Sequence, residues 1–221
     1  MNKGQKLLKK AKKIIPGGNQ LLSKRNEMFL PGVWPAYYKK AKGCKVWDLN
    51  NKMYYDFAGM GVTTCILGYA DKDVDKVVTN AIKNSTMTTL NTYEEVQLAE
   101  KLLDLHNWAE QVRFARTGGE ACSIAIRLAR AATGKDKILF CGYHGWHDWY
   151  LSANLKKKNL DDQLLPGLES KGVPSNLKDS VYPFGVNDFN SFQKALNKFN
   201  NNIAAVIMEP VRSAKTDLKF L

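Results

Sequence analysis

The sequence lacks both common glycine-rich nucleotide motifs: neither GxGxxG nor GxxxxGK[ST] occurs in its 221 residues. It has no apolar run that approaches the length of a membrane span, and its N-terminus has no apolar core of the kind that a secretory signal needs. The four cysteines are scattered without CxxC spacing, which favours reduced thiols in a cytoplasmic protein. We therefore expect a cytoplasmic globular protein outside the main nucleotide-binding classes.

Acidic residues are scarce relative to basic ones, which gives a net charge of +12. Most lysines are dispersed, and the two clusters, at residues 9–13 and 156–158, are not interleaved with aromatic side chains. A platform for single-stranded nucleic acid needs that interleaving, so the clusters are interpreted as solvated faces. The sequence predicts no nucleic-acid or membrane partner, and a field that favours anionic small molecules.

The most informative stretch runs from residue 111 to residue 149. Its first five residues, Gln111–Ala115, alternate apolar and polar side chains, which predicts a short strand. Thr117 and Glu120 then have the spacing of a capping box, apolar residues follow at helical spacing to residue 132, and Gly134 is placed to end the helix. The apolar run Lys137–Cys141 predicts a second, buried strand, so the stretch is expected to form a βαβ unit.

The turn at the start of this helix is a candidate anion site. Two glycines, Gly118 and Gly119, let a ligand approach the backbone closely, and the free N–H groups of a first helical turn face it together with the positive end of the helix dipole. The hydroxyl of Thr117 adds a further donor. The same four residues also make an ordinary helix start, so the spacing alone leaves both interpretations open.

Elsewhere the pattern alternates between helices and strands. Residues 19–37 and 59–69 look irregular, and the chain after Trp149 loses periodicity as far as Ser180, which indicates a surface excursion. An Asn50-Asn51 turn predicts a hairpin within a small antiparallel sheet over residues 36–57. The remaining predicted elements are helices over 3–15, 71–84, 94–105 and 189–199 and strands over 181–184 and 203–208.

The polar residues of the loop after the second strand allow a competing interpretation. Cys141, His144, His147 and Asp148 are all possible transition-metal ligands, although glycines and aromatics intervene and no second ligand pair occurs elsewhere. A metal-binding protein and a protein that binds a ligand without catalysis therefore stay open as alternatives at this point.

Three motifs, in this order along the chain, are similar to those of one enzyme family. They are Thr117-Gly118-Gly119-Glu120-Ala121, Tyr143-His144-Gly145, and Glu209-Pro210 after the apolar run 203–208. Together with Pro16-Gly17-Gly18, they resemble the class III, fold-type I pyridoxal-phosphate-dependent aminotransferases, and among these most closely the glutamate-1-semialdehyde 2,1-aminomutases.

The resemblance implies an α/β fold with a mainly parallel sheet. It assigns residues 1–57 to an N-terminal helix, an irregular segment and a small antiparallel sheet, and residues 58–221 to the first part of the cofactor-binding large domain. It implies pyridoxal 5'-phosphate as cofactor, a homodimer at full length, and a small-molecule amino donor and carbonyl acceptor as substrates. Intramolecular transfer of the aminomutase type is the alternative.

The resemblance also implies roles for particular residues. Thr117, Gly118 and Gly119 would hold the cofactor phosphate, Tyr143 would stack on the pyridine ring, and Glu209 would be a polar group near the cofactor. Lys24 or Arg25 could bind a substrate carboxylate, although the Asn-Ser-Pro-Val-Arg context of the aminomutases is replaced here by residues 19–25, NQLLSKR.

The family's Schiff-base lysine, and the aspartate that pairs with the pyridine nitrogen, are expected beyond Leu221. No catalytic lysine is therefore assigned within these residues, and the chain alone is expected to be inactive. The strand over 203–208 is expected to lack a partner on one side, and apolar helix faces are expected to lack cover.

Overall fold

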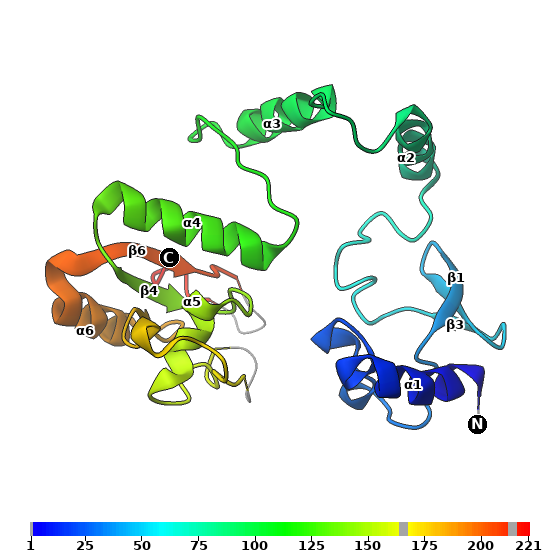
Figure 1. Ribbon diagram of the computed structural model, residues 1–221, viewed down its shortest axis with the longest axis horizontal. Coiled ribbons are helices and arrows are strands. Elements are labelled where there is room, and N and C mark those ends of the chain that lie inside the picture. Colours follow the sequence, from blue (N-terminus) through cyan, green and yellow to red (C-terminus); the bar gives the residue numbers. More distant parts are fainter. Residues whose placement is uncertain (1, 164–167, 212–215) are drawn as a thin grey trace. The chain divides into compact units, whose positions relative to one another are not determined.

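A computed structural model describes residues 2–163, 168–211 and 216–221 (Figure 1). Backbone contacts divide the chain into two compact units, Met1–Tyr93 and Glu94–Leu221. The sequence predicts a domain boundary after Phe57 instead, and that boundary stays a prediction. No described helix is both long and apolar enough to cross a membrane.

The first unit combines an N-terminal helix with a small antiparallel sheet. Asn2 caps α1 by accepting a hydrogen bond from the N–H of Gln5 at 2.7 Å. The sheet has the order β1-β2-β3, and the buried Asp48 shapes its second turn by accepting hydrogen bonds from the N–H groups of Asn50 and Lys52 at 2.8 and 2.9 Å. The elements are α1 (Lys3–Ile14), β1 (Tyr38–Lys42), β2 (Lys45–Asp48), β3 (Met53–Tyr55) and α2 (Lys72–Asn84). The predicted N-terminal helix, antiparallel sheet and second helix are thus confirmed.

The second unit contains a parallel sheet of order β5-β4-β6. Both neighbours of the central strand run parallel to it, which confirms the predicted sheet type. Asp188 caps α6 by accepting a hydrogen bond from the N–H of Ser191 at 2.9 Å, as the sequence around it predicts. The elements are α3 (Tyr93–Leu105), α4 (Gly118–Thr133), β4 (Lys137–Cys141), α5 (Asp148–Leu151), β5 (Val181–Pro183), α6 (Phe189–Phe199) and β6 (Ile203–Met208).

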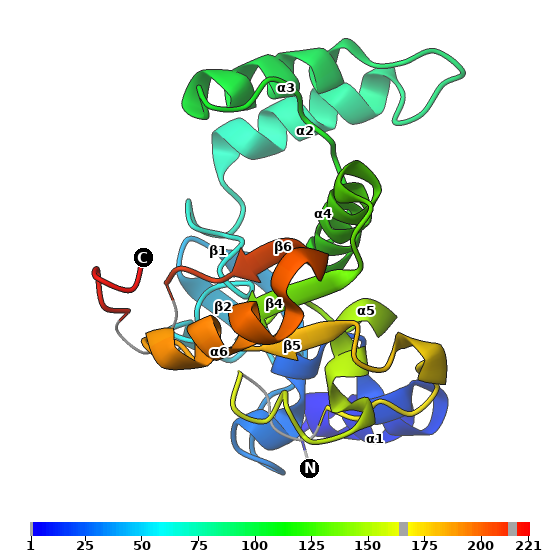
Figure 2. The same ribbon diagram turned by 90° about the vertical axis from the view of Figure 1, so that its left-hand side faces the viewer.

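The two faces of β4 bury alternate side chains against different helices. Ile138 and Phe140 belong to a cluster with Ile126 of α4, whereas Leu139 and Cys141 pack with residues of α6. This alternation follows from the period of two in a strand. Figures 1 and 2 show the result, in which α4 and α6 lie on opposite faces of the sheet. The sheet therefore holds the N-terminal end of α4 beside the loop that follows β4.

Two predictions for the second unit are wrong. Gln111–Ala115 is not a strand, because a strand needs a paired neighbour and no described strand lies against it. The segment after Trp149 is not only a surface excursion, since Tyr150 is 1 % exposed and Leu160 is 0 % exposed. These side chains complete the core under β4 without any regular periodicity, and Tyr150 packs edge-on against Phe140 with ring centroids 5.2 Å apart.

One edge of the sheet and several helix faces are uncovered within the described part of the chain. In the sheet order, β6 has β4 as its only described neighbour. The apolar face of α2 is exposed to the extent of 47 % at Val74, 68 % at Val77 and 59 % at Ile82. These observations match the sequence-based expectation of an unpaired strand edge and uncovered apolar faces.

Candidate functional site

The N-terminal end of α4 is held by a complete capping box. The N–H of Glu120 donates to Thr117 Oγ1 at 3.2 Å, while Glu120 Oε2 accepts from the N–H groups of Thr117 at 3.2 Å and Arg116 at 2.9 Å. The predicted helix start is thus confirmed. The Thr117 hydroxyl accepts a bond from its own helix, and its hydrogen stays available for another acceptor.

The two glycines of this turn keep their N–H groups available. Among the described residues, none accepts a hydrogen bond from the N–H of Gly118 or Gly119. A Cβ added at Gly118 would meet no atom within 4 Å, so the space beside it is open. The capping box therefore satisfies the N–H groups on either side and leaves two neighbouring donors at the positive end of a helix of 16 residues.

The loop after β4 passes directly over this helix start. Gly145 has a φ of 103°, and a Cβ added there would stand 2.9 Å from Gly119 Cα. Only glycine fits this close approach, because any side chain would strain the backbone and collide with the helix. The loop thus brings the motif Tyr143-His144-Gly145 to the candidate anion site, although the two segments are separated by the whole of α4.

Tyr143 is the half-buried ring of this loop. It packs edge-on against Tyr150, with ring centroids 5.9 Å apart, and burial raises the pKa of its phenol. The phenol therefore stays neutral in neutral solution. Two hydrogen bonds fix the backbone of the preceding residue, Gly142. The buried Gln163 side chain accepts a bond from its N–H at 2.8 Å, and Tyr150 Oη donates to its carbonyl at 2.8 Å.

Glu209 stands at the C-terminal end of β6, beside the start of the same loop. Its N–H donates to Cys141 O at 3.0 Å, and its Oε2 accepts a hydrogen bond from the N–H of Tyr143 at 3.3 Å. A Cβ added at Gly142 would stand 2.6 Å from Glu209 Cβ. The carboxylate thus anchors the loop that carries Tyr143, at the edge of a parallel sheet where α/β folds place ligands.

The described residues do not form the metal cluster that the sequence left open. They contain no group of three or more His, Cys, Asp or Glu side chains that could hold an ion. The two loop histidines bind protein groups: His144 Nε2 lies 2.9 Å from Cys141 O, and His147 Nδ1 lies 2.7 Å from Ser123 Oγ. The metal interpretation therefore has no support in this geometry.

The predicted substrate residues lie in the other compact unit. Lys24 and Arg25 are both exposed, and the Arg25 guanidinium lies against Gly17, where an added Cβ would be 3.1 Å from Arg25 Nη2. This contact ties Arg25 to the Pro16-Gly17-Gly18 turn. Their role toward a substrate stays a prediction.

Two residues that hold parts of the candidate site, Gln163 and Ser123, are not among those predicted from the sequence. No local signal marks Gln163, because it reaches Gly142 from an irregular segment. Ser123 lies four residues after Gly119 and therefore shares a helix face with it, so that spacing could have singled it out.

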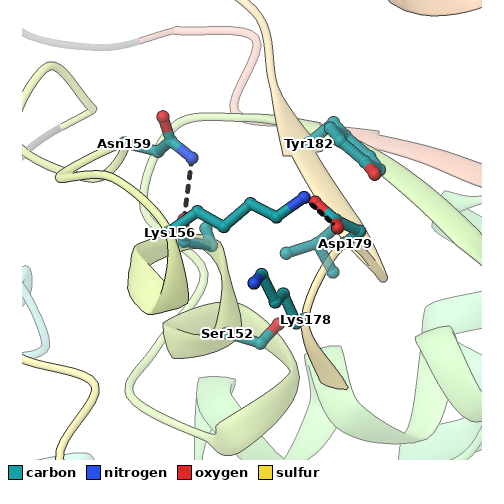
Figure 3. Close-up of a pocket in the computed structure, with 8 residues that line it drawn as sticks. Ser152, Lys156, Asn159, Lys178, Asp179 and Tyr182 are labelled. Atoms are coloured by element: carbon teal, nitrogen blue, oxygen red, sulfur yellow. Dashed lines mark hydrogen bonds and ion pairs between the residues drawn. The ribbon is translucent and has the colours of Figure 1, made fainter. Parts of the chain in front are cut away.

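A separate hollow lies between the turn after α5 and β5, and Figure 3 shows the residues that line it. An ion pair between Lys156 and Asp179 spans it, and Asn159 Nδ2 donates to Ala153 O at 2.7 Å. Its volume is about 30 Å³. That space is large enough for a water molecule and too small for an aromatic ligand, so the hollow is not a second candidate for the cofactor site.

Comparison with known proteins decides the family. The profile of the family described as aminotransferase class-III matches residues 31–217. This chain belongs to the class III aminotransferase family. It is 33 % identical over 206 residues to the 3-aminobutyryl-CoA aminotransferase of Cloacimonas acidaminovorans, a match that covers 93 % of this chain and 45 % of that protein.

Further relatives and solved structures support the same family assignment. The glutamate-1-semialdehyde 2,1-aminomutase of Methanobrevibacter smithii is 37 % identical over 93 % of this chain and 46 % of its own length. An omega-transaminase from Sphaerobacter thermophilus superposes with a TM-score of 0.78 at 26 % identity, over 95 % of this chain and 47 % of that one. A transaminase with PLP bound reaches a TM-score of 0.83 at 25 % identity, over 99 % and 50 %. This class III chain thus spans about half the length of the relatives it matches.

The cofactor of the class III aminotransferases is pyridoxal 5'-phosphate, and the residues of this chain fit its two ends. The paired N–H groups of Gly118 and Gly119 beside open space suit a phosphate, and a neutral, half-buried Tyr143 suits the face of an aromatic ring. The structure joins these two features through the contact of Gly145 with Gly119.

Proposed function

We propose that this chain supplies the phosphate-holding and ring-holding part of the active site of a pyridoxal-phosphate-dependent aminotransferase. The reaction class is transfer of an amino group from a small-molecule donor to a carbonyl acceptor. One observation carries the proposal: the capping box of α4 satisfies the N–H groups of Arg116, Thr117 and Glu120 and leaves those of Gly118 and Gly119 for an anion.

When bound, pyridoxal phosphate supplies an electron sink for chemistry at a substrate amine. The residues of this chain hold and orient it. Gly118 and Gly119 donate to the phosphate, and Thr117 adds its hydroxyl hydrogen. Tyr143 covers one face of the ring and excludes water from it. Glu209 fixes the loop by accepting the Tyr143 N–H and so sets the position of that ring.

A single substitution can remove one phosphate donor and keep the helix. Gly118→Pro deletes the N–H at the first helical position, where proline is favoured, and the preceding Thr117 has the extended backbone (φ −136°, ψ 156°) that a following proline requires. Loss of one charge-assisted hydrogen bond is worth roughly 1.5–3 kcal/mol. We therefore expect the affinity for pyridoxamine 5'-phosphate, measured by calorimetry on the protein at its native length, to fall by about 10- to 100-fold.

The matched control is Gly118→Ala, which keeps the N–H and places a methyl group in open space. We expect this variant to bind the phosphorylated ligand more tightly than the proline variant, because it keeps the N–H of residue 118. Equal affinity of the proline variant and the wild type would overturn the assignment of Gly118 to the phosphate.

Intramolecular amino transfer of the aminomutase type is a second candidate, favoured by the 37 % identity to an aminomutase. The two candidates differ in stoichiometry. A transaminase needs a separate carbonyl acceptor, whereas an aminomutase converts one amino-carbonyl substrate into its isomer without one. Turnover of a single substrate in the absence of any added acceptor would select the aminomutase.

We also propose that the protein works as a cytoplasmic homodimer. The four cysteines form no disulfide in the structure, which suits a reducing compartment. The uncovered apolar face of α2 is suited to burial against a second subunit.

A further inference from the structure

His147 and Ser123 form a side-chain pair beside the candidate phosphate site, and the function proposed above does not use it. The imidazole lies along one face of α4: its Nδ1 is 2.7 Å from Ser123 Oγ, and its Nε2 is the atom nearest to the place of a Cβ on Gly119, at 3.2 Å. Gly119 and Ser123 are one helical turn apart on the same face. The ring therefore points its Nε2 toward the N-terminal end of the helix.

The position of this ring is fixed at both ends. The carbonyl of His147 accepts hydrogen bonds from the N–H groups of Tyr150 at 2.9 Å and Leu151 at 3.0 Å, which hold its backbone at the start of α5. The Trp146 ring packs edge-on against the imidazole, with centroids 4.9 Å apart. Within the described ranges, no group forms a hydrogen bond with His147 Nε2.

We propose that His147 Nε2 is an additional ligand of the cofactor phosphate and that Ser123 is its positioning residue. Gly119 contributes only its backbone, and the imidazole occupies the space that a side chain on residue 119 would take. A hydrogen-bonding side chain from the loop after β4 thereby lies where residue 119 of α4 supplies none. The inference rests on the proposed function, because it requires that the phosphate lie over Gly118 and Gly119.

Ser123 can set the proton position that this role needs. Its Oγ lies 2.9 Å from Gly119 O and 2.7 Å from His147 Nδ1, so the hydroxyl can donate to either. When it donates to Nδ1, the proton of a neutral imidazole is on Nε2, and Nε2 is then a hydrogen-bond donor. An anion over Gly119 favours this arrangement, because it gains a fourth donor beside the two N–H groups and the Thr117 hydroxyl.

The test compares two ligands that differ only in the phosphate. The affinities of the native-length protein for pyridoxamine 5'-phosphate and pyridoxamine are measured by calorimetry, and their ratio is the readout. A residue with a merely structural role would weaken both ligands together and leave the ratio unchanged. His147→Asn keeps a nitrogen beside Ser123 but has no atom at the place of Nε2, and we expect it to lower the ratio by about ten-fold or more.

Two further variants separate the roles within the pair. His147→Gln places an amide N–H near the position of Nε2 and should retain most of the ratio, while Ser123→Ala should lower it by a smaller factor than His147→Asn. The double variant Gly119→Thr with His147→Ala places a hydroxyl donor on the helix in place of the imidazole. It should therefore have a higher affinity ratio than His147→Ala alone. When His147 is present, Gly119→Thr alone should bind pyridoxamine 5'-phosphate poorly, since the threonine Cβ would lie only 3.2 Å from His147 Nε2.

The outcomes are distinct for the inference and for the function on which it rests. A wild-type ratio near one would overturn both, because no phosphate site would exist. A high wild-type ratio that His147→Asn leaves unchanged would overturn the role of His147 and leave the proposed function intact.

Discussion

Gly142→Ala is expected to destabilise the second unit by roughly 3–5 kcal/mol. Gly142 has a φ of 100°, and an added Cβ would stand 2.6 Å from Glu209 Cβ and 2.8 Å from Glu209 Oε2. The carboxylate could rotate away, but Glu209 Cβ is fixed by the end of β6, so the collision persists in every rotamer. The loss is a large share of the stability of a typical domain, and denaturant unfolding of the native-length protein measures it.

Gly134→Ala is the matched control for this variant. Gly134 ends α4 in the left-handed region with a φ of 66°, but no atom lies within 4 Å of its added Cβ. Gly134→Ala should therefore lower the free energy of unfolding only by the backbone strain, about 1–2 kcal/mol. Equal effects of the two variants would show that the contact between Gly142 and Glu209 does not hold the loop.

The 221-residue chain, expressed by itself, is expected to associate instead of melting cooperatively as a monomer. The exposed face of α2 presents Val74, Val77, Val78 and Ile82 at helical spacing, and β6 leaves one side without a described partner strand. Contiguous exposed apolar surface and an unpaired strand edge both favour association. Light scattering after size-exclusion chromatography measures the effect.

Two double variants on α2 identify the surface that drives association. Val77→Lys with Ile82→Lys adds charge to the apolar face and should reduce the associated fraction. Thr79→Lys with Asn80→Lys adds the same charge to other exposed positions and should leave it unchanged. A monodisperse monomer with a cooperative melting transition in the unmodified chain would contradict the expectation.

The sequence predicted those parts of the fold that are encoded by neighbours along the chain. The Thr117–Glu120 capping box, the left-handed glycine at residue 134 and the Asp188 cap each act over three or four residues, so their spacing is visible in the sequence. The apolar runs of β4 and β6 are likewise continuous in the sequence, as is typical of parallel strands, and β4 is buried on both faces.

The parts that the sequence did not predict depend on distant residues. Gln111–Ala115 has the alternation of a strand, but alternation supplies no partner, and pairing decides whether a strand forms. Tyr150 is buried from the four-residue helix α5 and Leu160 from an irregular segment, and neither is long enough or regular enough to show a periodicity. The close approach of Gly145 to Gly119 joins the two halves of the candidate site, and only the folded sheet brings them together.

A crystal structure of the native-length protein with pyridoxamine 5'-phosphate tests most directly whether the start of α4 holds the cofactor phosphate, because this ligand needs no covalent bond to a lysine. We expect phosphate oxygens about 2.7–3.2 Å from the backbone nitrogens of Gly118 and Gly119, with the ring of Tyr143 against the pyridine ring. A phosphate bound away from the N-terminal end of α4 would contradict this expectation.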